Sequence, residues 1–254
     1  MLLAFGVSDK GRVRSTNEDC FAICEELGLL VIADCMGGHN AGEVAAQLAV
    51  DVVVDTCRAA VSRPRLNGRP ERPAQHGEAG LLDSAIRSAH ACILETAITE
   101  PRYAGMGTTV VAARITEGHL AIGHVGDSRL YLMANGCLRQ LTHDDSWLEA
   151  VLAEDPDTNP ATLDRHPMRN ALTNVVGTRS CTTVHIAEAT LDGGELLLLT
   201  TDGVHGVLTD AWLERALGTG DDLPDMAARV VDGALRQGSR DNCTAIVARY
   251  EPQR

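Results

Sequence analysis

The feature that most constrains the fold is a series of short apolar runs rich in β-branched residues, most of them bounded by Gly, Asp or Asn. Runs of this kind predict β-strands, because branched side chains pack well on a pleated, buried surface. Aromatic residues make up only 3% of the chain, so the core must be mainly aliphatic. We expect strands at Leu2–Val7, Leu29–Ala33, Thr108–Ile115, Leu120–Val125, Leu130–Met133, Thr183–Ala187, Leu196–Thr200 and Thr244–Ala248.

Segments with helical spacing of apolar residues separate some of these strands. Between Thr108 and Leu141 the predicted strands follow one another without a helix, and Asn135-Gly136 is typical of a hairpin turn. This order predicts antiparallel meanders flanked by helices, an α+β fold, rather than a doubly wound parallel sheet. The expected helices are Ala41–Ala60, Leu81–Thr99, Ser146–Ala153, Asp210–Leu217 and Asp222–Leu235.

The chain has 254 residues, a length that suits one domain spanning 1–254, and it contains no internal repeat or domain linker. The stretch Ser62–Gly80 is rich in Pro and Arg and almost free of apolar side chains. Such a segment cannot bury enough surface to order itself. We therefore expect a mobile surface loop at about 62–80, between two helices.

Composition excludes several classes of function. Lys and Arg number 22 against 35 Asp and Glu, a net charge of −13 without any basic run, so nucleic acid is not an expected partner. No apolar run approaches the roughly 20 residues of a membrane span, and MLLAFGVSDKGRVR lacks the order of a signal peptide. Eight cysteines without a C-x-x-C pair indicate neither a disulfide framework nor a zinc knuckle. We expect a cytoplasmic protein with no membrane partner.

Carboxylates stand at the ends of several predicted strands: Asp34, Asp127 and Asp202 follow apolar runs, and Asp241 precedes one. A single Asp in such a place is usually a turn or cap residue. Four at one sheet edge would repel one another unless cations neutralised them, and hard oxygen ligands favour Mg²⁺ or Mn²⁺. The pattern therefore predicts a divalent-cation site.

Rival motifs do not fit. Asp155–Asn159 has the opening spacing of an EF-hand, but Pro160 and His166 stand where the loop needs Gly and a bidentate Glu. The chain has neither the G-x-x-x-x-G-K-[ST] of a P-loop nor the G-x-S-x-G of a serine hydrolase.

Eight segments along the chain carry a recognisable set of motifs: SDKGRVRSTNED, VIADCMGGHNAGEVAA, GMGTTVVAA, HVGDSRLYL, LTHDDS, LTNVVGT, LLLTTDGVHGVLTD and DNCTAIV. With these segments in this order, the chain resembles the metal-dependent type 2C Ser/Thr protein phosphatases, particularly their compact bacterial form. The resemblance implies a four-layer α-β-β-α sandwich with two central antiparallel sheets and a dimetal site at one end.

The resemblance also implies a ligand set for two Mn²⁺ or Mg²⁺ ions, which together make a bridging water acidic enough to attack a phosphoester. A weaker third metal site occurs in many bacterial members. The implied ligands are Asp34 as the bridge, Asp202 and Asp241 on the first ion, the carbonyl of Cys35 on the second, Glu18 and Asp19 through metal-bound waters, and Asp127 with Asp202 at the third site.

Three further residues carry roles by resemblance. Arg14 matches the arginine that clamps the substrate phosphate, a task for which a planar guanidinium is suited. His39 could protonate the leaving oxygen, with water as the competing proton donor. Cys35 replaces the family's usual Gly; its carbonyl serves equally well if the backbone tolerates a Cβ, and the alternative is a thiol that tunes the site to redox state or soft metals. The family's flap corresponds to 141–176, which we expect to select the phosphoprotein.

The resemblance implies a monomeric enzyme that hydrolyses phosphoserine and phosphothreonine on proteins and opposes a bacterial Ser/Thr kinase. The alternatives are a catalytically weak scaffold of the same fold and a regulator that switches a partner protein. The intact Asp34, Asp202 and Asp241 argue against a scaffold, because clustered carboxylates without a catalytic use only cost stability.

Overall fold

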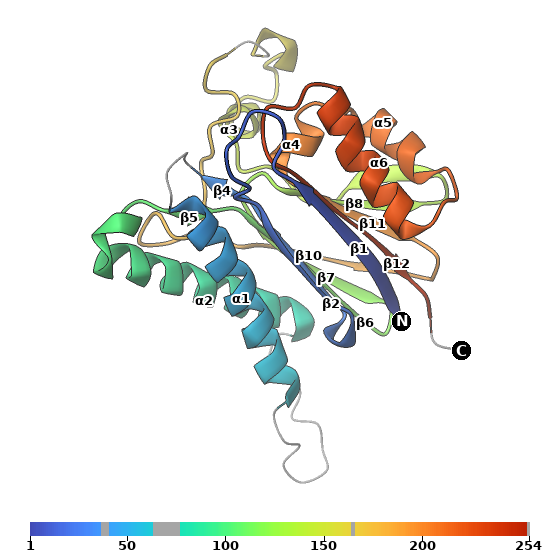
Figure 1. The fold of residues 1–254 in the computed structure, drawn as a ribbon, viewed down its shortest axis with the longest axis horizontal. Helices are drawn as coiled ribbons and strands as arrows, with labels where there is room; N and C mark the ends of the chain where they lie inside the picture. Colours follow the sequence, from blue (N-terminus) through green and yellow to red (C-terminus); the bar gives the residue numbers. More distant parts are fainter. Residues whose placement is uncertain (37–40, 63–76, 164–165, 253–254) are drawn as a thin grey trace.

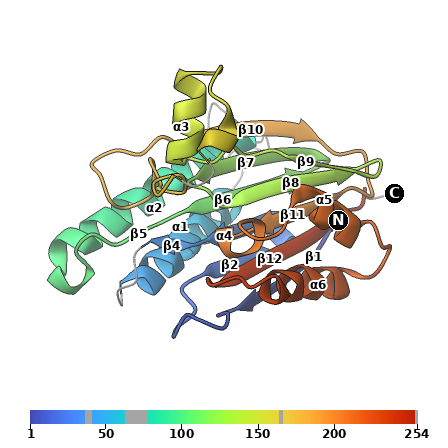
Figure 2. The same cartoon turned by 90° about the horizontal axis from the view of Figure 1, so that it is seen from above.

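The computed structural model describes residues 1–36, 41–62, 77–163 and 166–252. Two antiparallel five-stranded sheets lie face to face (Figure 1, Figure 2). One sheet has the strand order β1 (Leu2–Asp9), β12 (Cys243–Tyr250), β11 (Leu196–Thr200), β8 (Arg129–Ala134) and β9 (Cys137–Gln140). The other has the order β10 (His185–Thr190), β7 (His119–Val125), β6 (Val110–Thr116), β3 (Leu29–Ala33) and β2 (Cys20–Cys24). A third, two-stranded sheet pairs β4 (Cys35–Met36) with β5 (Gly107–Thr108).

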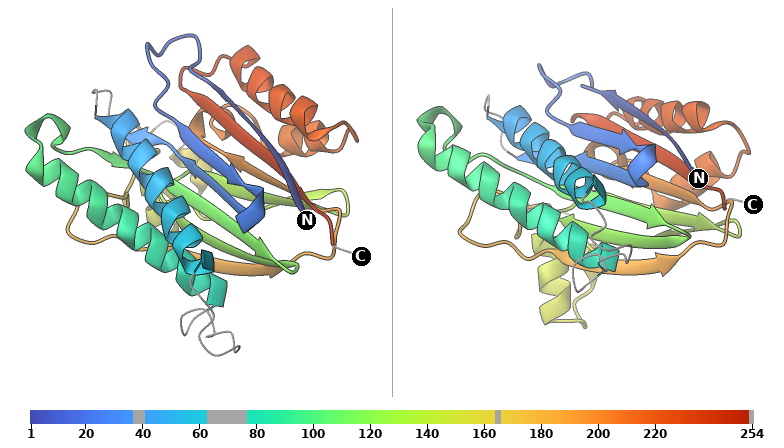
Figure 3. Two further views of the ribbon diagram at one scale, coloured as in Figure 1. Left: turned by 60° about the horizontal axis from the view of Figure 1, so that its bottom comes forward. Right: turned by 90° about the horizontal axis from the view of Figure 1, so that it is seen from below.

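Helices cover both outer faces of the sandwich. Figure 3 shows α1 (Gly42–Ser62) and α2 (Gly77–Thr99) side by side over the sheet that contains β3. The helices α5 (Asp210–Leu217) and α6 (Leu223–Arg236) pack on the other sheet. The predicted four-layer α-β-β-α architecture is therefore confirmed. The remaining elements are α3 (Trp147–Glu154), α4 (Asp202–His205) and the 3-10 turns Glu25–Leu27, Pro101–Tyr103 and Pro160–Thr162.

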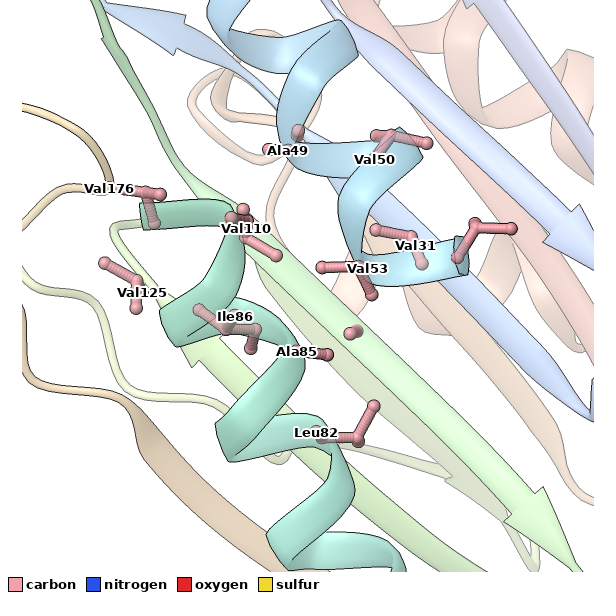
Figure 4. Packing of buried hydrophobic residues seen from close by; sticks show 14 of the residues in the cluster. Val31, Ala49, Val50, Val53, Leu82, Ala85, Ile86, Val110, Val125 and Val176 are labelled. Atoms are coloured by element: carbon pink, nitrogen blue, oxygen red, sulfur yellow. The ribbon is translucent and has the colours of Figure 1, made fainter. Parts of the chain in front are cut away.

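Alternation along β3 explains why its sequence is a continuous apolar run. Leu30 and Ile32 contribute to the core between the two sheets. Their neighbours Leu29, Val31 and Ala33 belong to the cluster under α1 and α2, part of which Figure 4 shows around Val31. Because both faces of the strand are buried, every position is apolar. Full burial of each large aliphatic side chain contributes roughly 1.5–3 kcal/mol.

The helices begin where the sequence provides caps. The side chain of Asp222 accepts a hydrogen bond from the Asp225 amide at the start of α6, and Ser146 accepts from the Glu149 amide at the start of α3. Each cap satisfies a backbone donor that the helix itself leaves unpaired. Both helices start within one residue of their predicted first positions.

The predicted loop at about 62–80 is too long at its C-terminal end. Ser62 closes α1, and α2 begins at Gly77 rather than at Leu81. The carboxylate of Glu78 in the first turn of α2 pairs with the guanidinium of Arg114, and both side chains are largely buried. This ion pair holds the first turn against the sheet. The rest of the predicted loop, 63–76, lies outside the described residues.

Two predicted strands also differ from the structure. The run Thr108–Ile115 is split at Thr109, whose amide leaves the ladder and donates to the carbonyl of Asp34 at 2.8 Å. The strand β10 begins at His185 rather than Thr183, because the Thr183 amide binds the side chain of Asn174. Polar contacts with distant residues therefore override the local pattern. Within the described ranges, no helix is long and apolar enough to cross a membrane.

Candidate metal centre

The strand-end aspartates gather at one end of the sandwich. This end carries the β1–β2 loop, β4 and α4, and it lies opposite the end at which both termini lie (Figure 1). The five aspartates occupy separate connections: Asp19 precedes β2, Asp34 follows β3, Asp127 lies between β7 and β8, Asp202 opens α4, and Asp241 precedes β12.

Asp34 lies at the centre of this group. Burial raises its pKa well above the ordinary range of an Asp, and the charges of four neighbouring carboxylates raise it further. Those four neighbours are Asp19, Asp202, Asp127 and Asp241. The tertiary structure thus brings together residues that the sequence places more than 200 positions apart.

The charged forms of the neighbouring carboxylates are disfavoured in the same way. Burial raises the pKa of Asp19 to about 6. Burial and the charges of Asp202 and Asp144 raise the pKa of Asp127 to about 7. Burial, followed by the charge of Asp241, raises the pKa of Asp202. Buried like charges are costly unless a counter-charge compensates them, and this site has the electrostatics of a cation site.

Two carboxylate oxygens give a direct test of whether a metal fits. Oδ1 of Asp19 and Oδ1 of Asp202 are buried and lack a hydrogen-bond partner among the described residues. Buried acceptors are normally satisfied, and hard divalent cations take such oxygens as ligands. As they are placed in the described ranges, no three His, Cys, Asp or Glu side chains form a group that could hold a metal ion. The conclusion that a divalent cation suits this site therefore rests on the chemistry of the carboxylate donors and on these two oxygens, and not on ligand distances.

Threonines hold Asp34 in place. The Asp34 amide donates to Oγ1 of Thr109 at 3.0 Å, and Oγ1 of Thr108 donates to the Asp34 carbonyl at 2.9 Å. Oγ1 of Thr109 also lies 2.7 Å from Oγ of Ser128, next to Asp127. These residues were not predicted from the sequence. The available signal was a pair of threonines beginning an otherwise apolar run.

Asp19 is fixed through one oxygen only. Oγ1 of Thr201 and Oγ1 of Thr244 donate to its Oδ2, at 2.9 and 2.6 Å. These hydroxyls come from the ends of β11 and β12, beside Asp202 and Asp241. The arrangement leaves Oδ1 of Asp19 as an unpartnered acceptor.

Arg14 lies at the rim of the site. Its Nη2 is 2.6 Å from Oδ2 of Asp241, and 43% of the Arg14 side chain is exposed. Its guanidinium is thus accessible from solvent while remaining attached to the carboxylate cluster. Such a cation is suited to an anionic group that enters from outside.

Asn242 fastens the loop that carries Arg14. Its Oδ1 accepts from the Glu18 amide, and its Nδ2 donates to the carbonyls of Lys10 and Thr16, each at 2.9 Å. A Cβ on Gly203 would lie 1.8 Å from the Asn242 carbonyl, so α4 can approach this turn only with glycine there. Asn242 was not predicted from the sequence, although it is polar and directly follows the ligand candidate Asp241.

Cys35 adopts an ordinary backbone conformation. Glu117 and Asn135 are the non-glycine residues with positive φ in the described part of the chain, so Cys35 tolerates its Cβ. Its thiol donates to Oε2 of Glu18 at 2.8 Å. Burial, and then this hydrogen bond, raise the pKa of Cys35 far above the ordinary value, which keeps the thiol protonated. In this state the thiol acts as a hydrogen-bond donor to Glu18.

The structure therefore brings together Arg14, Asp34, Cys35, Asp127, Asp202, Asp241, Glu18 and Asp19. The predicted proton donor His39 lies outside the described residues. The fold and the site define a four-layer α-β-β-α protein with a candidate divalent-cation centre at one end.

Comparison with known proteins gives the family. Residues 10–238 match the family model described as protein phosphatase 2C, and the chain belongs to this family. It is 33% identical over 246 residues to serine/threonine protein phosphatase PstP of Mycobacterium tuberculosis, covering 95% of this chain and 43% of PstP. The chain thus spans less than half the length of that relative. It is 30% identical over 243 residues to serine/threonine phosphatase stp of Listeria monocytogenes, covering 94% of this chain and 92% of stp.

Solved structures of related phosphatases have the same fold as this chain. The M. tuberculosis PstP/Ppp crystal structure has a TM-score of 0.85 at 30% identity, covering 98% of this chain and 99% of that chain. Stp1 from Staphylococcus aureus has a TM-score of 0.86 at 30% identity, covering 99% and 96%. The catalytic domain of PstP in complex with two manganese ions has a TM-score of 0.80 at 30% identity, covering 98% and 97%. The predicted family and fold are confirmed.

Proposed function

We propose that this chain hydrolyses phosphoserine and phosphothreonine on proteins, with two Mn²⁺ or Mg²⁺ ions, and opposes a bacterial Ser/Thr kinase. The observation that carries the proposal is the gathering of four carboxylates around Asp34, with Arg14 at the solvent-facing rim. The relatives named as Ser/Thr phosphatases and the PstP structure with two manganese ions support it. The kinase, the monomeric state and the cytoplasmic location stay predictions.

The ligand assignments follow the family pattern. Asp34 would bridge the ions, Asp202 and Asp241 would complete one shell, and the carbonyl of Cys35 would face the second ion. Glu18 and Asp19 would act through water, and Asp127 would serve a third ion. When bound, a dimetal centre supplies a water acidic enough to attack a phosphorus atom at neutral pH.

The residues of the chain bind the substrate and fix the ligands. Arg14 would bind the phosphoryl group, because its guanidinium forms two parallel hydrogen bonds with phosphate oxygens. The hydroxyls of Thr201 and Thr244 hold Asp19 at fixed distances, so this carboxylate does not need to reorganise during turnover. For the leaving oxygen we propose His39 as the proton donor, with water as the competitor.

We propose that the chain is one phosphatase domain and that the segment 141–176 selects the protein substrate. This segment, which contains α3, projects from the sandwich beside the candidate metal centre (Figure 2). A scaffold without catalysis is the alternative, but the ordinary backbone of Cys35 and its hydrogen bond to Glu18 are compatible with a working site.

The test is hydrolysis of a phosphothreonine peptide by metal-stripped protein, with and without millimolar Mn²⁺. We expect turnover only with the metal, its loss in Asp34→Asn, and a raised KM in Arg14→Ala. Asp192→Asn is the matched control, because Asp192 is an exposed carboxylate in the β10–β11 turn. Absence of turnover with either Mn²⁺ or Mg²⁺ would contradict the proposal.

A further inference from the structure

A polar junction around a largely buried carboxylate lies beside the candidate metal centre and takes no part in the proposed chemistry. At its centre is Asp145, near the start of the 141–176 segment. Its Oδ1 lies 2.8 Å from Nε2 of His185. Its Oδ2 accepts from the Gly126 amide at 2.9 Å and from Nδ2 of Asn174 at 2.8 Å. Only 12% of the Asp145 side chain is exposed. We call these four residues the Asp145 junction.

The backbone of Asp145 adds two further connections. Its amide donates to the Gly126 carbonyl at 3.0 Å, and its carbonyl accepts from the Thr173 amide at 2.8 Å. Asp145 thus joins both ends of the 141–176 segment to the β7–β8 loop and to β10. In a fully satisfied buried network the bonds reinforce one another, and removal of one partner leaves the others unpaired.

Gly126 is the residue immediately before Asp127. Its φ is +97°, a conformation that favours glycine, and both of its backbone polar groups bind Asp145. The direction in which the chain leaves Gly126 sets the position of the Asp127 carboxylate. A single residue therefore fixes both the Asp127 carboxylate and the 141–176 segment.

Two titratable side chains next to the junction make contacts of their own. The neighbouring carboxylate Asp144 forms an ion pair with Arg129 at 2.7 Å. The ring of His124 stacks on His185 with centroids 4.9 Å apart, and its Nε2 lies 2.9 Å from the His143 carbonyl. His185 is thus the ring that contacts the Asp145 carboxylate.

We propose that Asp145 is a positioning residue that couples the 141–176 segment to the Asp127 carboxylate. A divalent cation at Asp127 and an ordered 141–176 segment then stabilise each other. Such coupling is reciprocal: whatever orders the segment, including a protein substrate, strengthens cation binding by the same factor. The inference rests on the proposed function in one respect, the assignment of Asp127 as a cation ligand.

Hydrogen exchange of backbone amides in 147–173, followed as Mn²⁺ is titrated, tests the coupling without reference to catalysis. In the unmodified chain we expect Mn²⁺ to slow this exchange, with a midpoint that matches the weakest Mn²⁺ site measured by calorimetry. In Asp145→Asn the side chain loses its negative charge, and one of the two accepting oxygens is replaced by an NH2 group that can only donate. We expect the weakest site to lose about tenfold in affinity, or about 1.4 kcal/mol, and the slowing of exchange to disappear.

Variants of His185 separate positioning from general stability. His185→Gln keeps a donor near the position of Nε2 and should behave as the unmodified chain does, whereas His185→Ala should weaken the coupling. The matched controls are His119→Ala and Glu188→Gln, which break an exposed His–carboxylate contact of 3.5 Å on the same pair of strands. Neither control should change the weakest Mn²⁺ site or the exchange in 147–173.

The inference is overturned if Asp145→Asn melts as the unmodified chain does and keeps both the weakest Mn²⁺ affinity and the slowed exchange. If Asp145→Asn does not fold, His185→Ala decides by the same two readouts. It is also overturned if Mn²⁺ leaves the exchange of 147–173 unchanged in the unmodified chain. Hydrolysis of the phosphothreonine peptide by the same sample shows separately whether the proposed function holds.

Discussion

Nη2 of Arg14 lies 2.6 Å from Oδ2 of Asp241, although 227 positions separate the two residues in the sequence. Asn242 holds them together, because its side chain binds the backbone on both sides of Arg14, at Lys10 and Thr16. The proposed phosphate-binding cation is thus attached to a proposed metal ligand. We expect changes at Arg14 itself to affect substrate binding more than metal-dependent chemistry.

Replacement of Arg14 tests this arrangement. We expect Arg14→Lys to raise KM for a phosphothreonine peptide about tenfold and Arg14→Ala to raise it further, with a smaller effect on kcat, because a lysine is a point charge without the planar fork of donors. Steady-state kinetics at saturating Mn²⁺ measure both constants. Arg12→Ala, in the same exposed loop, is the control. An unchanged KM in Arg14→Ala would contradict the assigned role.

Asp34→Asn should abolish hydrolysis and yet stabilise the metal-stripped protein. The pKa of Asp34 is raised in the folded chain, so the folded state binds this proton more tightly than the unfolded state does. Ionisation therefore costs stability, and the cost grows as pH rises from the ordinary Asp pKa through the raised one. Asn carries no charge and avoids this cost at pH 7.

Calorimetry in the presence of a chelator measures this effect. A stabilisation of 1 kcal/mol raises the Tm of a domain of this size by about 2–4 °C. Asp192→Asn, at an exposed turn, should leave the Tm unchanged. A Tm of Asp34→Asn at or below that of the unmodified chain would show that the carboxylates do not repel one another as described.

Cys35 should act as a hydrogen-bond donor and not as a reactive thiol. Since burial and Glu18 raise its pKa, iodoacetamide at pH 8 should modify Cys35 much more slowly than the exposed Cys137 and Cys181. Cys35→Ser keeps a donor to Glu18 and should retain Mn²⁺ affinity, whereas Cys35→Ala should weaken it several-fold. Peptide mass spectrometry and calorimetry give the two readouts. Equal labelling rates would refute the buried, hydrogen-bonded thiol.

His90 should make the fold sensitive to acid. The side chain is buried, and its Nδ1 accepts from the Gly177 amide at 3.1 Å, which requires an unprotonated Nδ1. Burial lowers the pKa of His90 below its ordinary 6.5. The unfolded chain therefore takes up this proton first, and stability is lost as pH falls below about 6.5 toward the lowered folded pKa.

Thermal unfolding of His90→Asn measures the contribution, because the Asn carbonyl can accept the same hydrogen bond without titrating. We expect the Tm of this variant to fall less steeply than that of the unmodified chain between pH 6.5 and pH 5. His119→Asn, at an exposed position, is the control. Parallel Tm profiles for His90→Asn and the unmodified chain would count against the prediction.

Much of the fold was predictable because elements buried in the core carry recognisable apolar patterns over a few consecutive residues. The strand β3 could be recognised from five consecutive apolar residues, and α6 from its Asp cap and apolar spacing. The edge strand β2 was not predicted. Its short run Cys20–Cys24 is half-buried and packs at the border of the sheet, so its pattern is weaker.

The candidate site was also predictable only in part. The positions of Asp34, Asp127, Asp202 and Asp241 at predicted strand ends were enough to indicate a cation site. The residues that position those carboxylates were not predicted, because Thr109, Thr201 and Asn242 look like ordinary turn or strand residues. Their role appears only when the partners from other strands are in place.

The sequence by itself determined most of the segments that become strands and helices and which carboxylates stand at strand ends, since both depend mainly on neighbours within a few residues. The stacking of the two sheets decided which of those carboxylates share one site. It also placed Arg14 against Asp241, and Asp145 against Gly126 and His185. These contacts depend on how distant strands are ordered and registered, a property of the packed core as a whole that no local pattern records.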